Sequence, residues 1–429
     1  MLKKESRNPW LWIPTLYLAE GIPYVLVMFV STVMYQNLGI SNANIAFYTS
    51  LLYLPWVIKP FWSPFVDNLK TKRFWIILMQ FTISIGLIGI AFFLKISAFF
   101  FITLFFFYII AFSSATHDIA ADGFYMLALN QHDQSLFVGI RSTFYRLAMI
   151  FGQGALVILA GYLQKTLNDI LSAWITTVSC AALIFIIFSS YHKGILPYPA
   201  IDENQIRKNV SEISKSFLDT FVSFLKKKQI IIIVLFILFY RLGEGQLVKM
   251  SSLFMLDTKS AGGLNLDTET VGFIYGTVGI IALMMGGILG GIVCAKKGVK
   301  FWIWWMLLAI NLPDLVYVYL AFTQPENIFI INGMIAIEQL GYGFGFTAFM
   351  MVLIYVSQGR YKTAHYAIAT GIMALGMMLP GMISGIIQEA IGYQNFFIWV
   401  CISTIPVFII TKFLKIDPDF GKKTNAIQT

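Results

Sequence analysis

The chain has 429 residues, of which 58% are hydrophobic, 16% aromatic and only 12% charged. This composition is too apolar for a soluble protein of this length and indicates a polytopic membrane protein. The net charge of +9 does not indicate a nucleic-acid partner, because the basic residues lie mainly in loops between apolar runs. The three cysteines lie inside apolar runs, so no disulfide framework is predicted.

Twelve apolar runs are long enough to cross a bilayer. Most lysines and arginines fall in loops on the same side as the N-terminus, whereas the opposite loops hold only Lys95, Lys165 and Lys259. The positive-inside rule therefore predicts that both termini are cytoplasmic. The predicted fold class is an all-α integral membrane protein whose twelve transmembrane helices span residues 11–36, 44–66, 74–94, 98–129, 136–163, 168–191, 230–256, 269–294, 301–322, 327–357, 361–388 and 393–414.

The longest polar stretch, 192–229, is expected to be a cytoplasmic linker between two six-helix halves, 1–191 and 230–429. The halves repeat weakly, because Leu18–Gly21 in the first run matches Leu242–Gly245 in the seventh. Two six-helix halves repeated in parallel topology resemble the layout of the major facilitator superfamily. In that layout the substrate binds near the bilayer midplane between the halves, which rock to give alternating access.

The first run carries Glu20 and Tyr24, and its repeat in the seventh run carries Arg241 and Glu244. The first run has no small-residue cleavage site, so it is expected to be a retained span and not a signal peptide. One interpretation is that these four residues line a central cavity and bind the substrate. The alternative is helix packing, in which the glycine after each glutamate permits close approach.

The second run contains Lys59, and the loop after it contains Asp67 and Arg73. Asp67 and Arg73 occupy the position of a charged gating loop, so a gating ion pair is expected there. Lys59 either takes part in gating or binding inside the membrane, or extends its ammonium group to the cytoplasmic surface.

The fourth run places His117, Asp118 and Asp122 in an apolar setting. Such a group costs roughly 2.5–3.5 kcal/mol in a membrane helix, which favours a functional role. Asp118 and Asp122 are four residues apart and share one helix face, with His117 about 100° from Asp118. The two carboxylates are predicted to carry protons; the alternative is a static ion pair with arginines of the fifth run. His117 either joins the proton pathway or only accepts or donates a structural hydrogen bond.

The repeat bears on this choice, because the tenth run has no acid at the positions that match Asp118 and Asp122. The pair is therefore interpreted as a specialisation of the first half. Glu338 in the tenth run and Asp314 in the ninth are assigned no role.

The fifth run contains Arg141 and Arg146, which are five residues apart and about 140° apart around a helix. Arg146 lies deeper and is the favoured substrate ligand, because a guanidinium binds carboxylates in bidentate fashion. Arg141 either binds substrate too, pairs with the acids of the fourth run, or lies near the cytoplasmic mouth.

No metal-ligand cluster, nucleophile motif or P-loop is found in any run, so neither an enzyme nor a cofactor is predicted.

The first half resembles one branch of the superfamily, the AmpG-type muropeptide permeases and related acetyl-coenzyme A transporters. The resemblance rests on Glu20-Gly21-Ile22-Pro23-Tyr24, on 53–67 with its Leu54-Pro55-Trp56 and Lys59-Pro60-Phe61-Trp62, on Ala115-Thr116-His117-Asp118-Ile119-Ala120-Ala121-Asp122-Gly123, and on Tyr145-Arg146-Leu147-Ala148-Met149. The family commonly has glutamine where His117 stands.

The resemblance implies proton-driven import of anhydro-muropeptides across the cytoplasmic (inner) membrane of a bacterium. The expected partners are this small anionic solute, protons and the lipid bilayer, and the protein is expected to function as a monomer. Two alternatives remain: transport of a different anion, such as an acyl-coenzyme A or another conjugate, and a non-transporting membrane sensor.

Overall fold

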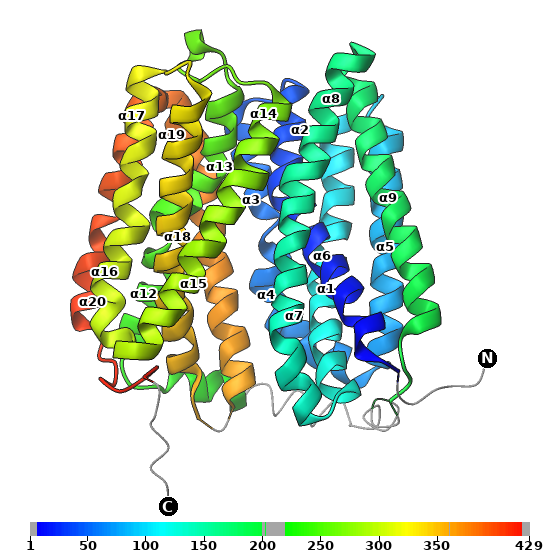
Figure 1. The fold of residues 1–429 in the computed structure, drawn as a ribbon, viewed down its shortest axis with the longest axis vertical. Helices are drawn as coiled ribbons and strands as arrows, with labels where there is room; N and C mark the ends of the chain where they lie inside the picture. The colour runs from blue at the N-terminus through cyan, green and yellow to red at the C-terminus, as the bar shows by residue number, and fades with distance from the viewer. Residues whose placement is uncertain (1–6, 200–201, 203–218, 360, 423–429) are drawn as a thin grey trace, which may run out of the picture. The chain divides into compact units, whose positions relative to one another are not determined.

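The computed structural model describes residues 7–199, 202, 219–359 and 361–422, and every secondary-structure element in this part of the chain is a helix (Figure 1). The chain forms two compact units. Unit 1 contains Met1–Ser41, Leu51–Leu218 and Asp267–Gly276, and unit 2 contains Asn42–Ser50, Asp219–Leu266 and Thr277–Thr429. Each unit therefore includes a short segment from the opposite half of the sequence.

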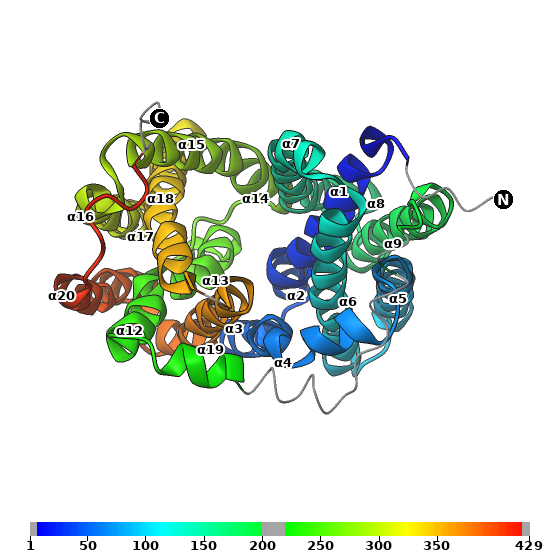
Figure 2. The same ribbon diagram turned by 90° about the horizontal axis from the view of Figure 1, so that it is seen from below.

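Unit 1 is built from long apolar helices and several short helical segments. They are η1 (Pro9–Leu11), α1 (Ile13–Val25), η2 (Leu26–Val30), α2 (Ser31–Asn37), α4 (Leu54–Asn68), α5 (Lys72–Phe93), α6 (Phe99–Ala128), α7 (Gln131–Met149), η3 (Ile150–Leu156), α8 (Val157–Leu167), α9 (Ile170–Ile195) and the short α14 (Thr268–Phe273). Helix α6 packs against α1, α4 and α5, and α1 packs against α7 (Figure 2). These contacts bring the fourth, first, second and fifth predicted runs together.

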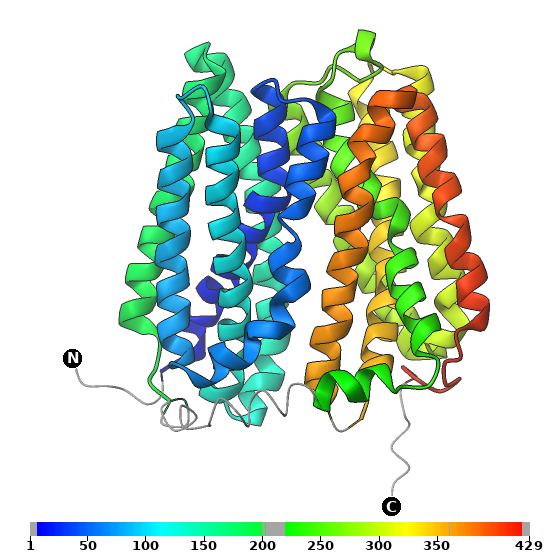
Figure 3. The same ribbon diagram turned by 180° about the vertical axis from the view of Figure 1, so that it is seen from behind.

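Unit 2 begins with α3 (Asn42–Leu51), of which all but the last residue belongs to it. The other elements are α12 (Ile230–Tyr240), α13 (Leu242–Leu256), η5 (Lys259–Ala261), α15 (Ile280–Lys297), α16 (Val299–Asn311), η7 (Leu312–Asp314), α17 (Leu315–Thr323), α18 (Ile328–Ser357), α19 (Lys362–Ser403) and α20 (Ile405–Phe413), with η6 (Ile274–Gly279) leading into α15. Helix α18 packs against α15, α16 and α19, and α13 packs along α19 (Figure 3).

Polar caps fix where several helices begin. Thr71 accepts a hydrogen bond from Phe74 N at the start of α5, Asn130 accepts one from Asp133 N at the start of α7, and Asp169 accepts one from Ser172 N at the start of α9. Each cap satisfies a backbone donor that has no partner inside the helix. The bonds that the Asp169 carboxylate accepts lower its pKa, as expected for a charged cap.

Ten helical segments in the described residues are long and apolar enough to cross a membrane. The twelve predicted spans differ from this set at two places. The second predicted span is divided between α3 and α4 by a turn at 52–53, and the last two lie within one apolar segment, Ala364–Phe413. That segment bends at Gly392, whose φ of 74° suits glycine.

Of the expected linker 192–229, residues 200–201 and 203–218 lie outside the described residues, as do residues 1–6 and 423–429. The division into halves at 1–191 and 230–429, the number of crossings and the side of the termini therefore stay predictions.

Helices α15 and α18 approach closely at glycines. A Cβ added at Gly286 would collide with the backbone oxygen of Leu340, and one at Gly343 would collide with the oxygen of Leu283. Small residues permit such contacts between membrane helices, where packing and not water exclusion drives association.

We expect Gly286→Ala to lower the melting temperature of the purified protein in detergent, because the new methyl group forces two helix backbones apart at a cost of about 1–3 kcal/mol. Gly291→Ala on the same helix is the matched control, since no atom lies within 4 Å of a Cβ added there. Alanine's better helix propensity should leave that variant as stable as the parent or more so. Equal melting temperatures for both variants would contradict the close contact.

Candidate functional site

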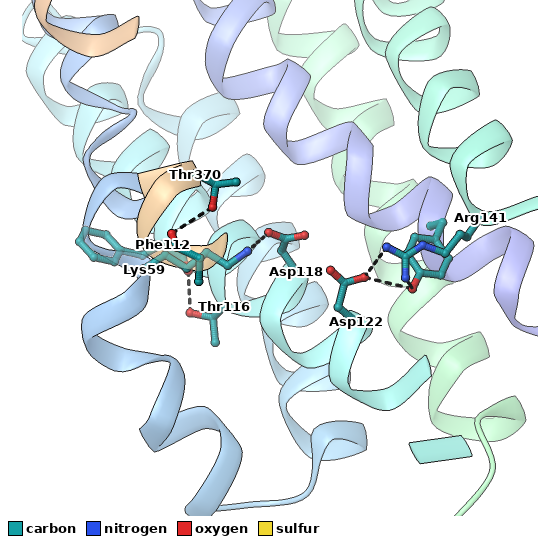
Figure 4. A network of polar contacts seen from close by, with 9 residues as sticks. Lys59, Phe112, Thr116, Asp118, Asp122, Arg141 and Thr370 are labelled. Atoms are coloured by element: carbon teal, nitrogen blue, oxygen red, sulfur yellow. Dashed lines mark hydrogen bonds and ion pairs between the residues drawn. The ribbon is translucent and has the colours of Figure 1, made fainter. Parts of the chain in front are cut away.

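The charged residues of α4, α6 and α7 form two ion pairs in unit 1 (Figure 4). The ammonium group of Lys59 on α4 binds Asp118 Oδ2 on α6, and each side chain is 24% exposed. The Lys59 side chain is therefore directed at an acid within the helix bundle.

Asp122, one turn after Asp118 on α6, has a different set of partners. Arg141 Nη2 lies 3.0 Å from Asp122 Oδ1 (Figure 4). The hydroxyl of Tyr17 donates to the same oxygen at 3.2 Å. Arg141 Nη1 also donates to the Tyr17 hydroxyl at 3.0 Å, and the guanidinium lies over the rings of Tyr17 and Tyr125. The ring faces add an attraction for the cation.

Glu20 on α1 adds a third carboxyl to these two pairs. Its side chain is buried, interacts electrostatically with Asp118 and Asp122, and leaves Oε2 with no hydrogen-bond partner in the described part of the chain. Neighbouring carboxylates repel each other in an apolar interior, which favours a proton on one of them. With two cations for three acids, the cluster of Glu20, Lys59, Asp118, Asp122 and Arg141 retains one proton when it is neutral. We call these five residues the unit 1 charge cluster.

His117 has partners other than those of Asp118. Its Nε2 lies 2.9 Å from the Gln80 side-chain amide on α5, whose oxygen lies 2.9 Å from Nδ1 of His192 on α9. The other nitrogen of His192 lies 3.0 Å from the Thr15 hydroxyl on α1. All three side chains of His117, Gln80 and His192 are buried.

The chain of hydrogen bonds has a defined direction. His192 donates from Nδ1 to the Gln80 oxygen, and the Gln80 amide donates to Nε2 of His117. His117 then ends the chain with a buried Nδ1 that has no partner among the described residues. This chain connects four helices of unit 1, and it is separate from the unit 1 charge cluster.

Three residues of these networks are not predicted from the sequence: Tyr17, Gln80 and His192. Tyr17 carries one signal, since it stands three residues before Glu20 and so shares its helix face. His192 was placed at the start of the linker, but it lies inside α9. A buried glutamine between two histidines has no sequence spacing that reveals it.

Arg146 and Tyr24, predicted to bind substrate, are not used by the ion pairs. Arg146 is partly buried, and within the described residues no hydrogen bond or ion pair involves it. Tyr24 packs edge-on against Trp56 at a ring distance of 5.4 Å and against Tyr53 at 6.5 Å. The structure therefore pairs Arg141 with an acid and leaves the Arg146 guanidinium available.

The predicted gating loop is described only in part, because nothing is described of the Asp67 side chain. Arg73 donates to the backbone oxygen of Lys193 at the end of α9, and its guanidinium lies 3.9 Å from the Tyr198 ring centre. An ion pair between Asp67 and Arg73 stays a prediction.

In unit 2, Arg241 and Glu244 at the start of α13 are both buried. Arg241 donates to the Tyr342 hydroxyl, lies 5.0 Å from the Phe346 ring centre, and interacts with the charge of Glu244. Asp314 and Glu338, for which the sequence predicts no role, interact electrostatically with Glu244. Unit 2 therefore gathers its own acids from positions other than those that match Asp118 and Asp122.

The described residues contain no group of three or more His, Cys, Asp or Glu side chains that could hold a metal ion.

Comparison with known proteins agrees with this architecture. The family model described as "Major Facilitator Superfamily" matches residues 15–385. The "Putative transporter AmpG 4" of Rickettsia conorii is 24% identical over 414 residues, which cover 92% of this chain and 94% of the relative. The "Putative transporter AmpG 1" of Rickettsia bellii is 26% identical over 401 residues, which cover 87% and 91%.

Two solved structures share the fold at low sequence identity. The nucleoside transporter NupG superposes with a TM-score of 0.71 at 15% identity, covering 96% of this chain and all of that chain. A D-xylose–proton symporter superposes with a TM-score of 0.67 at 13% identity, covering 96% and 99%.

We expect His117→Gln to leave the thermal stability of the protein nearly unchanged, because an amide can still bond to Gln80. His117→Leu should destabilise the protein by about 1–3 kcal/mol, since it leaves the Gln80 amide buried without that partner. Thermal unfolding in detergent measures both. His132→Leu, at an exposed position of α7, is the control. If His117→Gln destabilises as much as His117→Leu, the hydrogen-bonded chain does not hold the helices as described.

Proposed function

The chain belongs to the major facilitator superfamily and is thus a multi-pass membrane transporter and not an enzyme; we propose that it is a proton-coupled secondary transporter that imports a bulky anionic solute. The observation that carries this proposal is the unit 1 charge cluster. Its three carboxyls and two cations leave room for one proton whose gain or loss changes the net charge of the cluster.

Such a cluster couples protons to conformation through its ion pairs. When Asp118 is protonated, it no longer attracts Lys59 as a carboxylate, and the contact between α4 and α6 weakens. A ligand or proton that binds one conformation better shifts the population toward it by its difference in affinity. Asp118 and Asp122 are therefore assigned to proton coupling, and His117 to holding α6 in place.

The substrate is assigned from the groups that remain available. Arg146 has no acid partner in the described residues, and a free guanidinium binds a carboxylate or phosphate in bidentate fashion. Tyr24 and Trp56 offer aromatic faces in the same unit, which suit the apolar face of a sugar. Arg241 and Glu244 are proposed to bind substrate within unit 2, and Glu20 within unit 1.

A carboxylate-bearing glycopeptide has both features, so anhydro-muropeptide is the leading substrate. The motifs in the first half and the relatives named AmpG support the same choice. Transport of another anion, such as an acyl-coenzyme A, is the second candidate, because the fourth-run motif is shared with the branch that carries acetyl-coenzyme A.

The proposal includes the wider architecture. The protein crosses the membrane twelve times in two six-helix halves, with both termini in the cytoplasm. Lys59, Asp67 and Arg73 take part in gating. The protein lies in the cytoplasmic membrane and functions as a monomer without a cofactor.

Proton coupling predicts that proteoliposomes accumulate labelled anhydro-muropeptide when a proton gradient is imposed, and that Asp118→Asn abolishes the accumulation. The asparagine keeps the shape of the side chain but cannot carry a proton or attract Lys59 as an anion. An uncoupler should remove the gradient-driven uptake of the parent protein. Asp419→Asn is the control, because this exposed acid pairs with Lys422 three residues away, and it should retain full uptake. Undiminished uptake by Asp118→Asn and in the presence of uncoupler would show that coupling does not use this cluster.

The substrate assignment predicts that anhydro-muropeptides raise the melting temperature of the purified protein. A ligand at about 100 times its Kd stabilises the folded state by about 2.7 kcal/mol. Arg146→Gln should reduce this shift, whereas Asp419→Asn should leave it unchanged. A shift with acyl-coenzyme A and none with muropeptides would favour the second candidate. No shift with any transportable anion, together with no uptake, would favour a sensor.

A further inference from the structure

Unit 2 contains a cluster of three buried carboxyl groups that the proposed mechanism does not use as a unit. Glu244 on α13, Asp314 in η7 and Glu338 on α18 are 4%, 2% and 2% exposed. Asp314 interacts electrostatically with both glutamates, and Glu338 interacts with Glu244. Since the three residues come from three separate elements, only the folded unit brings them together. We call them the unit 2 acid cluster.

Asp314 is the least compensated member of the cluster. Its Oδ1 is buried and has no hydrogen-bond partner among the described residues. Its other oxygen faces the position of Gly243, where an added Cβ would lie 3.3 Å away, so the carboxyl packs directly beside the backbone that carries Glu244. A buried carboxylate without a donor or cation is strongly unfavourable, whereas a protonated carboxyl does not carry that charge penalty.

Glu338 has neutral partners that suit either protonation state. The Gln339 amide donates to Glu338 Oε2 at 2.9 Å, and Tyr317 on α17 also bonds to this carboxyl. A hydroxyl both donates and accepts, and an amide carries a donor and an acceptor. These partners therefore satisfy the carboxylate as well as the acid.

The other titratable groups near the cluster supply a single compensating cation. Arg241, at the start of α13, acts on Glu244; no cation acts on Asp314 or Glu338 within the described residues. Tyr317 and Tyr342 are neutral phenols, and Cys401 on α19, which interacts with Asp314, is a neutral thiol. Two uncharged residues are also near: Thr404, between α19 and α20, contacts the Gly243 position, and Asn311 ends α16.

The unit 2 acid cluster thus has three carboxyls and one guanidinium in a low-dielectric interior. Arg241 neutralises one carboxylate, and two more ionised acids close together would repel each other as well as lose their hydration. From this balance we propose that the unit 2 acid cluster is a second proton-binding site, in which Asp314 and Glu338 each hold a proton while Glu244 pairs with Arg241. The ligand is the proton and not a metal ion, because no three acids in the described residues are arranged to hold a metal.

The consequence for transport rests on the proposed function. If the protein is proton-coupled, unit 1 has one exchangeable proton and unit 2 has two, so the second unit takes part in coupling through residues that its repeat partner lacks. Proton binding itself does not depend on transport, and it is measurable on the isolated protein.

The test is infrared spectroscopy of the purified full-length protein in nanodiscs, reading the carbonyl band of protonated carboxyl groups at pH 7. Asp314→Asn and Glu338→Gln should each remove the intensity of about one carboxyl group, and the double variant about two. Glu326→Gln is the matched control, because Glu326 is 84% exposed and pairs with Lys259, which lowers its pKa and keeps it ionised. This variant should leave the band unchanged.

Tyr317→Phe adds a readout that keeps all three carboxyls. Loss of the phenol hydroxyl should shift the Glu338 component of the band without reducing its area, which also identifies the component if Asp314→Asn fails to fold. An unchanged band in both acid variants, or a band that disappears when potassium is replaced by sodium, would overturn the proposal. If the band behaves as expected but uptake is independent of protons, the proposed function fails and this site remains.

Discussion

The structure of unit 1 depends on one constraint: an ionised side chain inside an apolar helix bundle needs a partner of opposite charge. Asp118 and Asp122 lie one turn apart on α6, and each finds a cation on a different neighbouring helix. Lys59 ties α6 to α4, whereas Arg141 ties it to α7 with Tyr17 of α1 between them. The two acids therefore fix three helices around α6 (Figure 4).

The same constraint is met differently in the two units. In our proposal, unit 1 balances three carboxyls with two cations and one proton. Unit 2 has three carboxyls and Arg241, and the missing compensation comes from protons on Asp314 and Glu338 in our proposal. The two halves keep a glutamate at matching positions, Glu20 and Glu244. The acids around these glutamates come from positions that do not match.

Adjacent residues on a helix serve different purposes here. His117 and Asp118 point in directions about 100° apart, so one enters the packed interior toward Gln80 and the other meets Lys59. The histidine chain joins α6, α5, α9 and α1, and it holds the helix that carries both acids. Proton transfer and helix positioning are thereby assigned to neighbouring residues with separate partners.

The sequence by itself determined the membrane class, the helical fold and the importance of the fourth run, because hydropathy and the cost of buried charge are local properties of the chain. It placed Asp118, Asp122, Arg141 and Lys59 among the residues of interest but left their pairing open. The packing of the helices was needed to show that Arg141 and not Arg146 meets Asp122, that Tyr17 joins them, and that Asp314 and Glu338 interact electrostatically with Glu244. These contacts join residues far apart in sequence, and their geometry depends on how the helices pack. The spacing of residues along a single helix does not predict that packing.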